Sequence, residues 1–216
     1  MNNYTLGVDV WEGSLEIDEA AFRAGGVEFA FIRINDMNGG HHKDTGFDKS
    51  WAEAGEFIRA PYFVYNPWVS GKRNFDYMVS ILPAGVTTIA PDIEVRYTGY
   101  APATYAAQVR VFTDLMIDAD MLPIGYTAQW FLSNLLFWPK NIEYWWARYP
   151  TYLYPAATES ITWAQLKAKL DPVAWYPAAA GIIPGPCALW QCTADRYILP
   201  GTSRTLDINV FNGTPQ

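Results

Sequence analysis

The sequence contains little cysteine. Its 2 cysteines, Cys187 and Cys192, are too few for a disulfide framework or a Cys-rich zinc site. They flank a short apolar stretch that is typical of a strand, and five strand residues span roughly 16 Å at about 3.3 Å each. Cα atoms joined by a disulfide lie within roughly 7 Å of each other. We therefore expect both cysteines to be reduced.

The sequence also lacks basic clusters and long apolar runs. Its 15 Lys and Arg residues are outnumbered by 22 Asp and Glu residues, so the net charge is −7. Without a Lys/Arg-rich run, the sequence has no electrostatic footprint for nucleic acid or an anionic membrane, and we expect neither as a partner. No apolar stretch approaches the roughly 18 residues that cross a bilayer. The first residues, Met1-Asn2-Asn3-Tyr4, lack the regions of a signal peptide, so we expect any delivery outside a cell to use another route.

Motifs for metals, nucleotides and acyl transfer are missing as well. His41 and His42 are adjacent in a Gly-rich segment without the spaced partners of a metal site, and a loop role is the simpler interpretation. No Gly-x-Ser-x-Gly, Walker or Gly-x-Gly-x-x-Gly motif occurs. We expect no metal and no cofactor.

The order of apolar segments predicts the fold. With 216 residues, half of them hydrophobic, one domain spanning residues 1–216 is expected. Strands are predicted at residues 5–10, 27–34, 61–66, 86–93 and 123–127. Helices are predicted between them at residues 17–24, 47–58, 72–82 and 103–119.

The second part of the sequence has less helix. Strands are predicted at residues 142–148, 187–191 and 206–211, with one helix at 161–170. The pattern predicts an α/β fold: an irregular TIM-like barrel of five strand-helix units followed by three strands with little helix.

Carboxylates follow several predicted strands. A parallel barrel places its chemistry at the C-terminal ends of its strands. Asp9 ends the first predicted strand, Asp36 follows the second, Asp92 and Glu94 end the fourth, and Asp207 lies in the last. We therefore expect these side chains at one mouth of the barrel.

Asp92 and Glu94 form the strongest candidate pair. Residues two apart in a strand point to the same face, about 6.6 Å apart at Cα. Mutual repulsion raises the proton affinity of one carboxylate and prepares it as a general acid, as glycoside hydrolysis requires. The alternative is a solvated or salt-bridged strand end. The 10 Trp, 14 Tyr and 11 Phe residues are mostly core, but some suit a carbohydrate cleft, because sugars present flat C–H faces.

From about Leu6 to Gly213 the sequence resembles glycoside hydrolase family 25, the lysozymes that cut peptidoglycan. The resemblance rests on short motifs in a specific order: Gly7-Val8-Asp9-Val10, residues 26–33, Pro61-Tyr62-Phe63, Pro91-Asp92-Ile93-Glu94, Gly125-Tyr126-Thr127, residues 145–149, Leu189-Trp190-Gln191 and residues 206–211. It implies a lysozyme, or N-acetylmuramidase, that hydrolyses the β-1,4 bond between N-acetylmuramic acid and N-acetylglucosamine. The lack of a leader fits a phage-type endolysin or a virion-carried enzyme that acts on the cell wall.

The resemblance also implies roles. Glu94 matches the general acid, and Asp92 matches the carboxylate that in one proposal orients the substrate acetamido group for internal attack. Asp9 and Asp207 match the other acids of the mouth. The residues expected to contact substrate are Tyr62, Trp146, Tyr126, Arg33, Asp36 and Trp190. We expect a monomer whose partner is the glycan strand.

This sequence departs from the family pattern at several positions. Trp11-Glu12 follows the first strand directly, Phe63 stands where His is common, and Asp36 stands where Glu is frequent. Residues 161–170 and 172–186 look like an insertion. Two alternatives therefore stay open: a glycan-binding barrel that has lost turnover, and a barrel glycosidase that acts on another N-acetylated glycan such as chitin.

Overall fold

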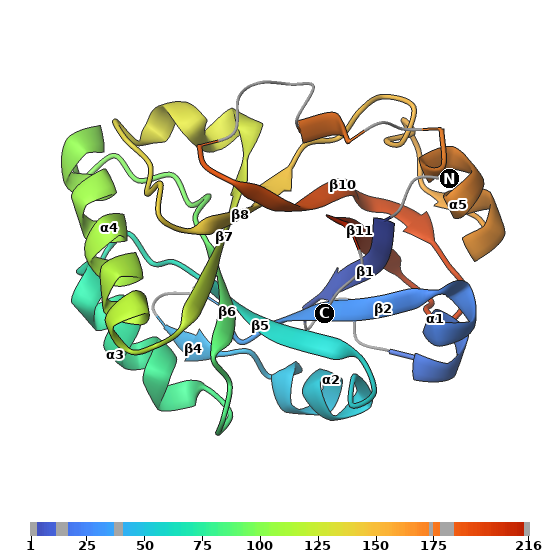
Figure 1. Cartoon of the computed structure of the whole chain (residues 1–216), viewed down its shortest axis with the longest axis horizontal. Helices are drawn as coiled ribbons and strands as arrows, with labels where there is room; N and C mark the ends of the chain where they lie inside the picture. Colours follow the sequence, from blue (N-terminus) through green and yellow to red (C-terminus); the bar gives the residue numbers. More distant parts are fainter. Residues whose placement is uncertain (1–3, 12–16, 37–40, 173–174, 178–183, 214–216) are drawn as a thin grey trace.

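The computed structural model describes residues 4–11, 17–36, 41–172, 175–177 and 184–213. It is an α/β barrel, as predicted (Figure 1). Seven strands of the barrel run parallel: β1 (Tyr4–Val10), β2 (Val27–Arg33), β5 (Ile58–Val64), β6 (Thr88–Asp92), β7 (Leu122–Ala128), β8 (Glu143–Ala147) and β10 (Cys187–Ile198). The last strand, β11 (Thr205–Asn212), pairs antiparallel with both β10 and β1 and closes the barrel.

Helices follow the early strands, and α3 and α4 lie side by side on one flank (Figure 1). The helices are α1 (Glu19–Gly25), α2 (Phe47–Glu53), α3 (Gly71–Ile81), α4 (Pro102–Asp118) and α5 (Trp163–Leu170). The fifth unit has only the 3₁₀ helix η1 (Gln129–Asn134) after its strand. Three short strands complete the fold: β3 (Asn35–Asp36), β4 (His42–Lys43) and β9 (Glu159–Ser160). The scarcity of helix after β8 confirms the predicted asymmetry.

Two predicted boundaries differ from the structure by five residues or more. The helix predicted at residues 47–58 ends at Glu53, because the backbone turns at Ala54 and Ile58 pairs with Phe29 of β2 as the first residue of β5. The strand predicted at residues 187–191 continues to Ile198, because β10 also pairs with β11 and β9. In both places pairing between distant segments overrides the local pattern.

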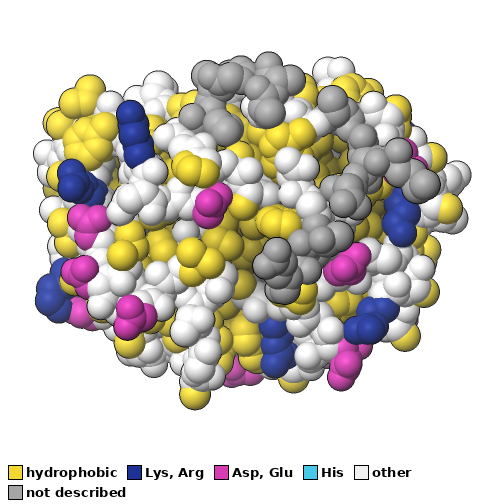
Figure 2. Space-filling view, viewed as in Figure 1, with side chains coloured by type: hydrophobic (Ala, Val, Ile, Leu, Met, Phe, Trp, Pro, Cys, Tyr) yellow, Lys and Arg dark blue, Asp and Glu magenta, His cyan; other side chains and the backbone are white. Residues whose placement is uncertain are grey.

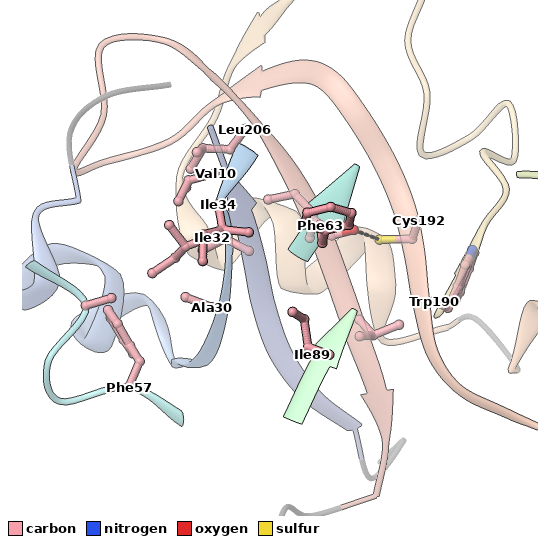
Figure 3. Packing of buried hydrophobic residues seen from close by; sticks show 14 of the residues in the cluster. Val10, Ala30, Ile32, Ile34, Phe57, Phe63, Ile89, Trp190, Cys192 and Leu206 are labelled. Atoms are coloured by element: carbon pink, nitrogen blue, oxygen red, sulfur yellow. Dashed lines mark hydrogen bonds between the residues drawn. The ribbon is translucent and has the colours of Figure 1, made fainter. Parts of the chain in front are cut away.

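Two apolar clusters lie on the two sides of the barrel wall. The outer cluster packs between strands and helices, and Figure 3 shows Val10, Ile32, Phe63 and Trp190 among its members. The free thiol of Cys192 is buried there and donates a hydrogen bond to the Ile208 carbonyl at 3.3 Å. Both cysteines are free, which confirms the expectation of reduced thiols.

The inner cluster fills the barrel below the mouth. Its members alternate with the outward-facing residues of the same strands and include Phe29, Phe31, Ala60, Tyr62, Ala90, Tyr126 and Trp145. Gly7 on β1 makes room for this packing, because a Cβ at this position would lie 2.1 Å from the Phe29 ring. The barrel interior is therefore filled by side chains and is not an open pore. The pockets that it leaves lie at its two ends.

Candidate active site

A pocket of about 80 Å³ opens at the C-terminal ends of the parallel strands. Every barrel strand except β2 supplies a lining residue from its own length, and Glu94 adds a further one two residues after β6 ends. The lining residues are Asp9, Tyr62, Asp92, Glu94, Tyr126, Trp145, Gln191 and Asp207. The structure thus brings together the four predicted catalytic carboxyl groups.

Asp207 reaches the pocket because β11 runs antiparallel to its neighbours. It lies near the start of β11, opposite Asp9 in the β1 register. An antiparallel strand begins where parallel strands end, so its first residues lie at the mouth. In a barrel of parallel strands alone, a residue near the beginning of the last strand would lie at the opposite end. The antiparallel direction of β11 explains why Asp207 joins this group.

Asp9 is buried and held by two side-chain amides. Gln191 Nε2 donates to its Oδ1 at 2.9 Å and to its Oδ2 at 3.2 Å, and Asn209 Nδ2 donates to Oδ1 at 2.6 Å. Burial raises the pKa of Asp9 to about 6, although the hydrogen bonds from Asn209 and Gln191 favour its ionised form and oppose the rise.

The two amides are fixed in turn by aromatic side chains. Tyr126 and Tyr149 donate their hydroxyl protons to Gln191 Oε1 at 2.8 and 2.6 Å. Trp145 Nε1 donates to Asn209 Oδ1 at 2.7 Å. Because both oxygens accept these bonds, both NH₂ groups point at Asp9, and its orientation is set by a buried network.

Asp92 differs from Asp9 in its hydrogen bonds. It is buried, and no group in the described part of the chain donates a hydrogen bond to its Oδ1. Burial raises its pKa well above the usual range, the nearby carboxyl groups of Glu94 and Asp9 raise it further, and Arg33 opposes the rise.

Glu94 lies two residues further along the chain, just beyond the end of β6. Burial, followed by the nearby charge of Asp9, raises its pKa to about 7. Burial also raises the pKa of Asp207 well above its usual range, with Asp9 and Asp195 adding to the effect. The pocket therefore holds carboxyl groups that keep protons near neutrality next to one that is stabilised as an anion, which is the division that acid–base catalysis needs.

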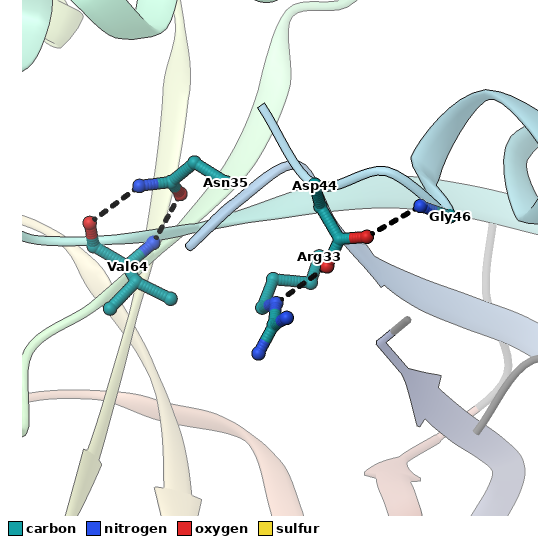
Figure 4. A network of polar contacts seen from close by, with 5 residues as sticks. All are labelled: Arg33, Asn35, Asp44, Gly46 and Val64. Atoms are coloured by element: carbon teal, nitrogen blue, oxygen red, sulfur yellow. Dashed lines mark hydrogen bonds and ion pairs between the residues drawn. The ribbon is translucent and has the colours of Figure 1, made fainter. Parts of the chain in front are cut away.

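Arg33 is held at the edge of the pocket by a network with Asp44 (Figure 4). Its Nε lies 2.7 Å from Asp44 Oδ2, while Asp44 Oδ1 accepts from Gly46 N at 2.8 Å. Its guanidinium carbon lies 5.0 Å from the ring centroid of Trp11. Arg33 therefore acts on Asp92 through its charge rather than by lining the pocket.

Asp36 lies outside the pocket. It pairs with His42 in the small β3–β4 hairpin. Burial raises the pKa of Tyr77 on α3, and the charge of Asp36 raises it further. His42 therefore belongs to a strand and not to a loop as predicted, whereas residues 37–40 of the predicted loop lie outside the described residues.

Trp146 and Trp190 are not pocket residues, contrary to the expectation from the resemblance. Both are almost completely buried, at 0% and 2% exposure, and neither lines the pocket. Trp190 donates from Nε1 to the Arg148 carbonyl at 2.8 Å, outside the barrel. Their sequence neighbours Trp145 and Gln191 face the pocket instead, because successive strand residues point to opposite faces.

Other residues of the site were missed by the sequence reasoning. Asn209 shares a face with Asp207 by the two-residue strand period, and a polar residue at Gln191 inside an apolar strand was a second signal. Tyr149 follows β8 and carried no comparable signal.

Comparisons with known proteins agree with this fold. The model of the family described as Glycosyl hydrolases family 25 matches residues 8–168. A bacterial lysozyme from Streptomyces coelicolor superposes with a TM-score of 0.71 at 20% identity, covering 97% of this chain and 93% of its own. A family GH25 lysozyme from Aspergillus fumigatus superposes with a TM-score of 0.69 at 16% identity, with coverages of 98% and 95%.

The modular Cpl-1 endolysin, solved in complex with a peptidoglycan analogue, superposes with a TM-score of 0.67 at 14% identity, covering 100% of this chain and 56% of its own. A search of curated protein sequences finds no match. Among the described residues, no helix has the length and apolar character needed to cross a membrane, and no three His, Cys, Asp or Glu side chains are grouped to hold a metal ion.

Proposed function

This chain belongs to glycosyl hydrolases family 25, and we propose that it is a muramidase that hydrolyses the β-1,4 bond between N-acetylmuramic acid and N-acetylglucosamine in bacterial peptidoglycan. One observation carries the proposal: Glu94, with a pKa raised to about 7, shares a pocket with Asp92 and with the hydrogen-bonded Asp9. The structural likeness to lysozymes and to an endolysin solved with a peptidoglycan analogue supports the choice of glycan.

Glu94 acts as the general acid in this proposal. Its raised pKa keeps a proton available near neutrality, and its place beyond the end of β6 puts that proton at the pocket lining. In the transition state the proton passes to the glycosidic oxygen as the bond to the sugar carbon breaks. The positive charge that develops on the sugar ring is stabilised by the anion of Asp9, which Gln191 and Asn209 hold by hydrogen bonds.

Two routes remain for the other half of the reaction. In the first, the substrate acetamido oxygen attacks the sugar carbon while Asp92 accepts the acetamido N–H. The buried Asp92 Oδ1, to which no described group donates, supports this route. In the second, a water molecule attacks directly and Asp9 or Asp207 takes its proton. The amide groups of Gln191 and Asn209 already donate hydrogen bonds to the oxygens of Asp9. Asp9 is therefore better suited to stabilising charge than to abstracting a proton.

Mass spectrometry of digested peptidoglycan tests the proposed function. A new reducing end on N-acetylmuramic acid is expected, because that end identifies the bond cut by a muramidase. A chitin oligomer assay run beside it provides the comparison. Cleavage of chitin alone would replace the proposal by a glycosidase of another N-acetylated glycan, and binding without any new reducing end would replace it by a non-catalytic barrel.

A further inference from the structure

The exposed tryptophans of this protein follow strands of the barrel. Among the described residues they are Trp11, Trp68 and Trp130, with 39%, 55% and 51% of their surfaces exposed. Trp11 comes directly after β1, Trp68 follows β5, and Trp130 lies in η1 directly after β7. Because these strands end at the pocket mouth, all three rings lie on the same end of the barrel as the carboxyl groups.

A single exposed apolar side chain needs no explanation, but several of the largest at the end of the barrel that holds the acidic pocket indicate a binding surface.

The loop that carries Trp68 is tied to α3 by hydrogen bonds. The backbone N–H of Trp68 donates to Asn66 Oδ1 at 2.9 Å. Asn66 is itself buried and tied to α3 by two bonds with Asn74, each of 2.9 Å. The ring of Tyr97 meets the indole edge-on, with centroids 5.5 Å apart. The indole is therefore positioned before any ligand arrives, which lowers the entropic cost of binding.

Trp130 is held in a comparable way from the other side. Its neighbour Phe131 is fully buried and anchors η1 against Tyr105 and Trp138. The guanidinium carbon of Arg96 lies 4.9 Å from the Trp130 ring centroid. About half of the Trp130 surface nevertheless remains open to solvent.

The residues that contact the two indoles are consecutive in the chain. Arg96 and Tyr97 come two and three residues after Glu94, and they contact Trp130 and Trp68 respectively. The segment that follows Glu94 thus lies between two exposed indoles, one from the loop after β5 and one from η1 after β7.

We propose that Trp68 and Trp130 are sugar-stacking platforms that bind units of the glycan strand beyond the sugars at the cleaved bond. This inference rests on the proposed function. A pocket of about 80 Å³ is far smaller than the roughly 300–1,000 Å³ sites that enclose drug-sized ligands, so it holds only the reacting groups. Further units of a polymer must lie on the rim, where flat C–H faces of sugars meet the exposed indoles.

The proposal predicts a dependence on chain length. Trp68→Ala and Trp130→Ala should each raise KM about tenfold on long soluble peptidoglycan chains, with kcat nearly unchanged, because platforms bind ground state and transition state alike. On the shortest cleavable fragment both variants should match the wild type. Trp68→Phe and Trp130→Phe should recover most of the affinity. Leu122→Ala, which removes a 53% exposed side chain at the first position of β7, is the matched control.

Circular dichroism of each variant first establishes that it is folded. Two results would contradict the proposed role of Trp68 and Trp130 without contradicting the muramidase function. The tryptophan variants could behave like Leu122→Ala on long chains, or they could lose equal activity on long and short substrates. A wild type that opens no bond in peptidoglycan would overturn the proposed function, and the platforms with it.

Discussion

Glu94 and Asp9 lie in one pocket and differ in their hydrogen bonds. Two amide groups donate to Asp9 and hold its pKa at about 6 despite its burial. Glu94, less deeply buried, has a pKa of about 7 because burial and the charge of Asp9 both favour its protonated form. The proton therefore resides on Glu94 at a pH where Asp9 is an anion.

This difference predicts a bell-shaped pH dependence. kcat/KM should fall above about pH 7, as Glu94 loses the proton that it must donate, and below about pH 6, as Asp9 becomes neutral. Initial rates on soluble peptidoglycan fragments across pH 4 to 9, at constant ionic strength, measure both limbs. A rate that still rises above pH 8 would contradict the assignment of the acid.

Asp92→Asn separates the two routes for the second half of the reaction. If the acetamido group attacks, the variant should lose at least about a hundredfold in kcat with little change in KM, because Asp92 acts mainly in the transition state. A thiazoline analogue of the N-acetyl sugar should then inhibit the wild type and bind the variant much less well.

The anomeric form of the first product gives an independent check on Asp92. Internal attack involves two displacements at one carbon and retains the anomeric configuration, whereas one displacement by water inverts it. NMR of the first turnover products distinguishes the two. The inverted anomer would eliminate the substrate-assisted route, whatever the variant does.

At the level of elements, most strands and helices of the barrel could be predicted from the sequence, but the inward faces of two strands could not. In β8 both Trp145 and Trp146 are buried, one inside the barrel and one outside. In β10 the same is true of Trp190 and Gln191. A parallel strand covered on both sides has no apolar–polar alternation to show its inward face, and a shift of one residue exchanges the faces.

The helix α5 belongs to the segment that the family pattern left unexplained. Trp163 at its start packs edge-on against Phe22 of α1 at 5.5 Å between centroids, and its Nε1 donates to the Pro200 carbonyl at 3.0 Å. A Cβ on Gly25 would lie 2.4 Å from the Trp163 ring. The helix α5 is therefore part of the packed outer layer, where it packs against α1, which is distant in the sequence.

Trp163→Ala should lower the free energy of unfolding by about 3 to 5 kcal/mol, because it removes a large buried ring and leaves a cavity beside Phe22. kcat should stay unchanged at temperatures where the variant is folded, since Trp163 does not line the pocket. Urea unfolding and initial rates measure the two effects. A stability equal to that of the wild type would show that α5 is peripheral to the fold.

At the scale of the whole molecule, acidic side chains gather inside one end of the barrel, while charges of both signs are scattered over the face shown in Figure 2. Burial raises the pKa of Asp9, Asp92, Glu94 and Asp207 above the values of an unfolded chain. Between about pH 4 and pH 7 the folded protein thus binds more protons than the unfolded chain, so the free energy of unfolding falls as pH rises.

Glu94→Gln should remove part of this loss of stability at high pH. The variant should match the wild type in stability near pH 4, where Glu94 is protonated in both the folded and the unfolded state. It should exceed the wild type by roughly 1 to 3 kcal/mol at pH 8, where the wild type buries the ionised group. Thermal unfolding at both pH values checks this, and a difference independent of pH would contradict the buried acid.

The turnover of Glu94→Gln on peptidoglycan tests the central claim most directly. The substitution keeps the size of the side chain and removes its acidic proton, so the fold and glycan binding should survive. Turnover should fall by roughly two to four orders of magnitude, as expected when a positioned general acid is lost. A folded Glu94→Gln protein that binds peptidoglycan and hydrolyses it at the wild-type rate would show that Glu94 is not the acid.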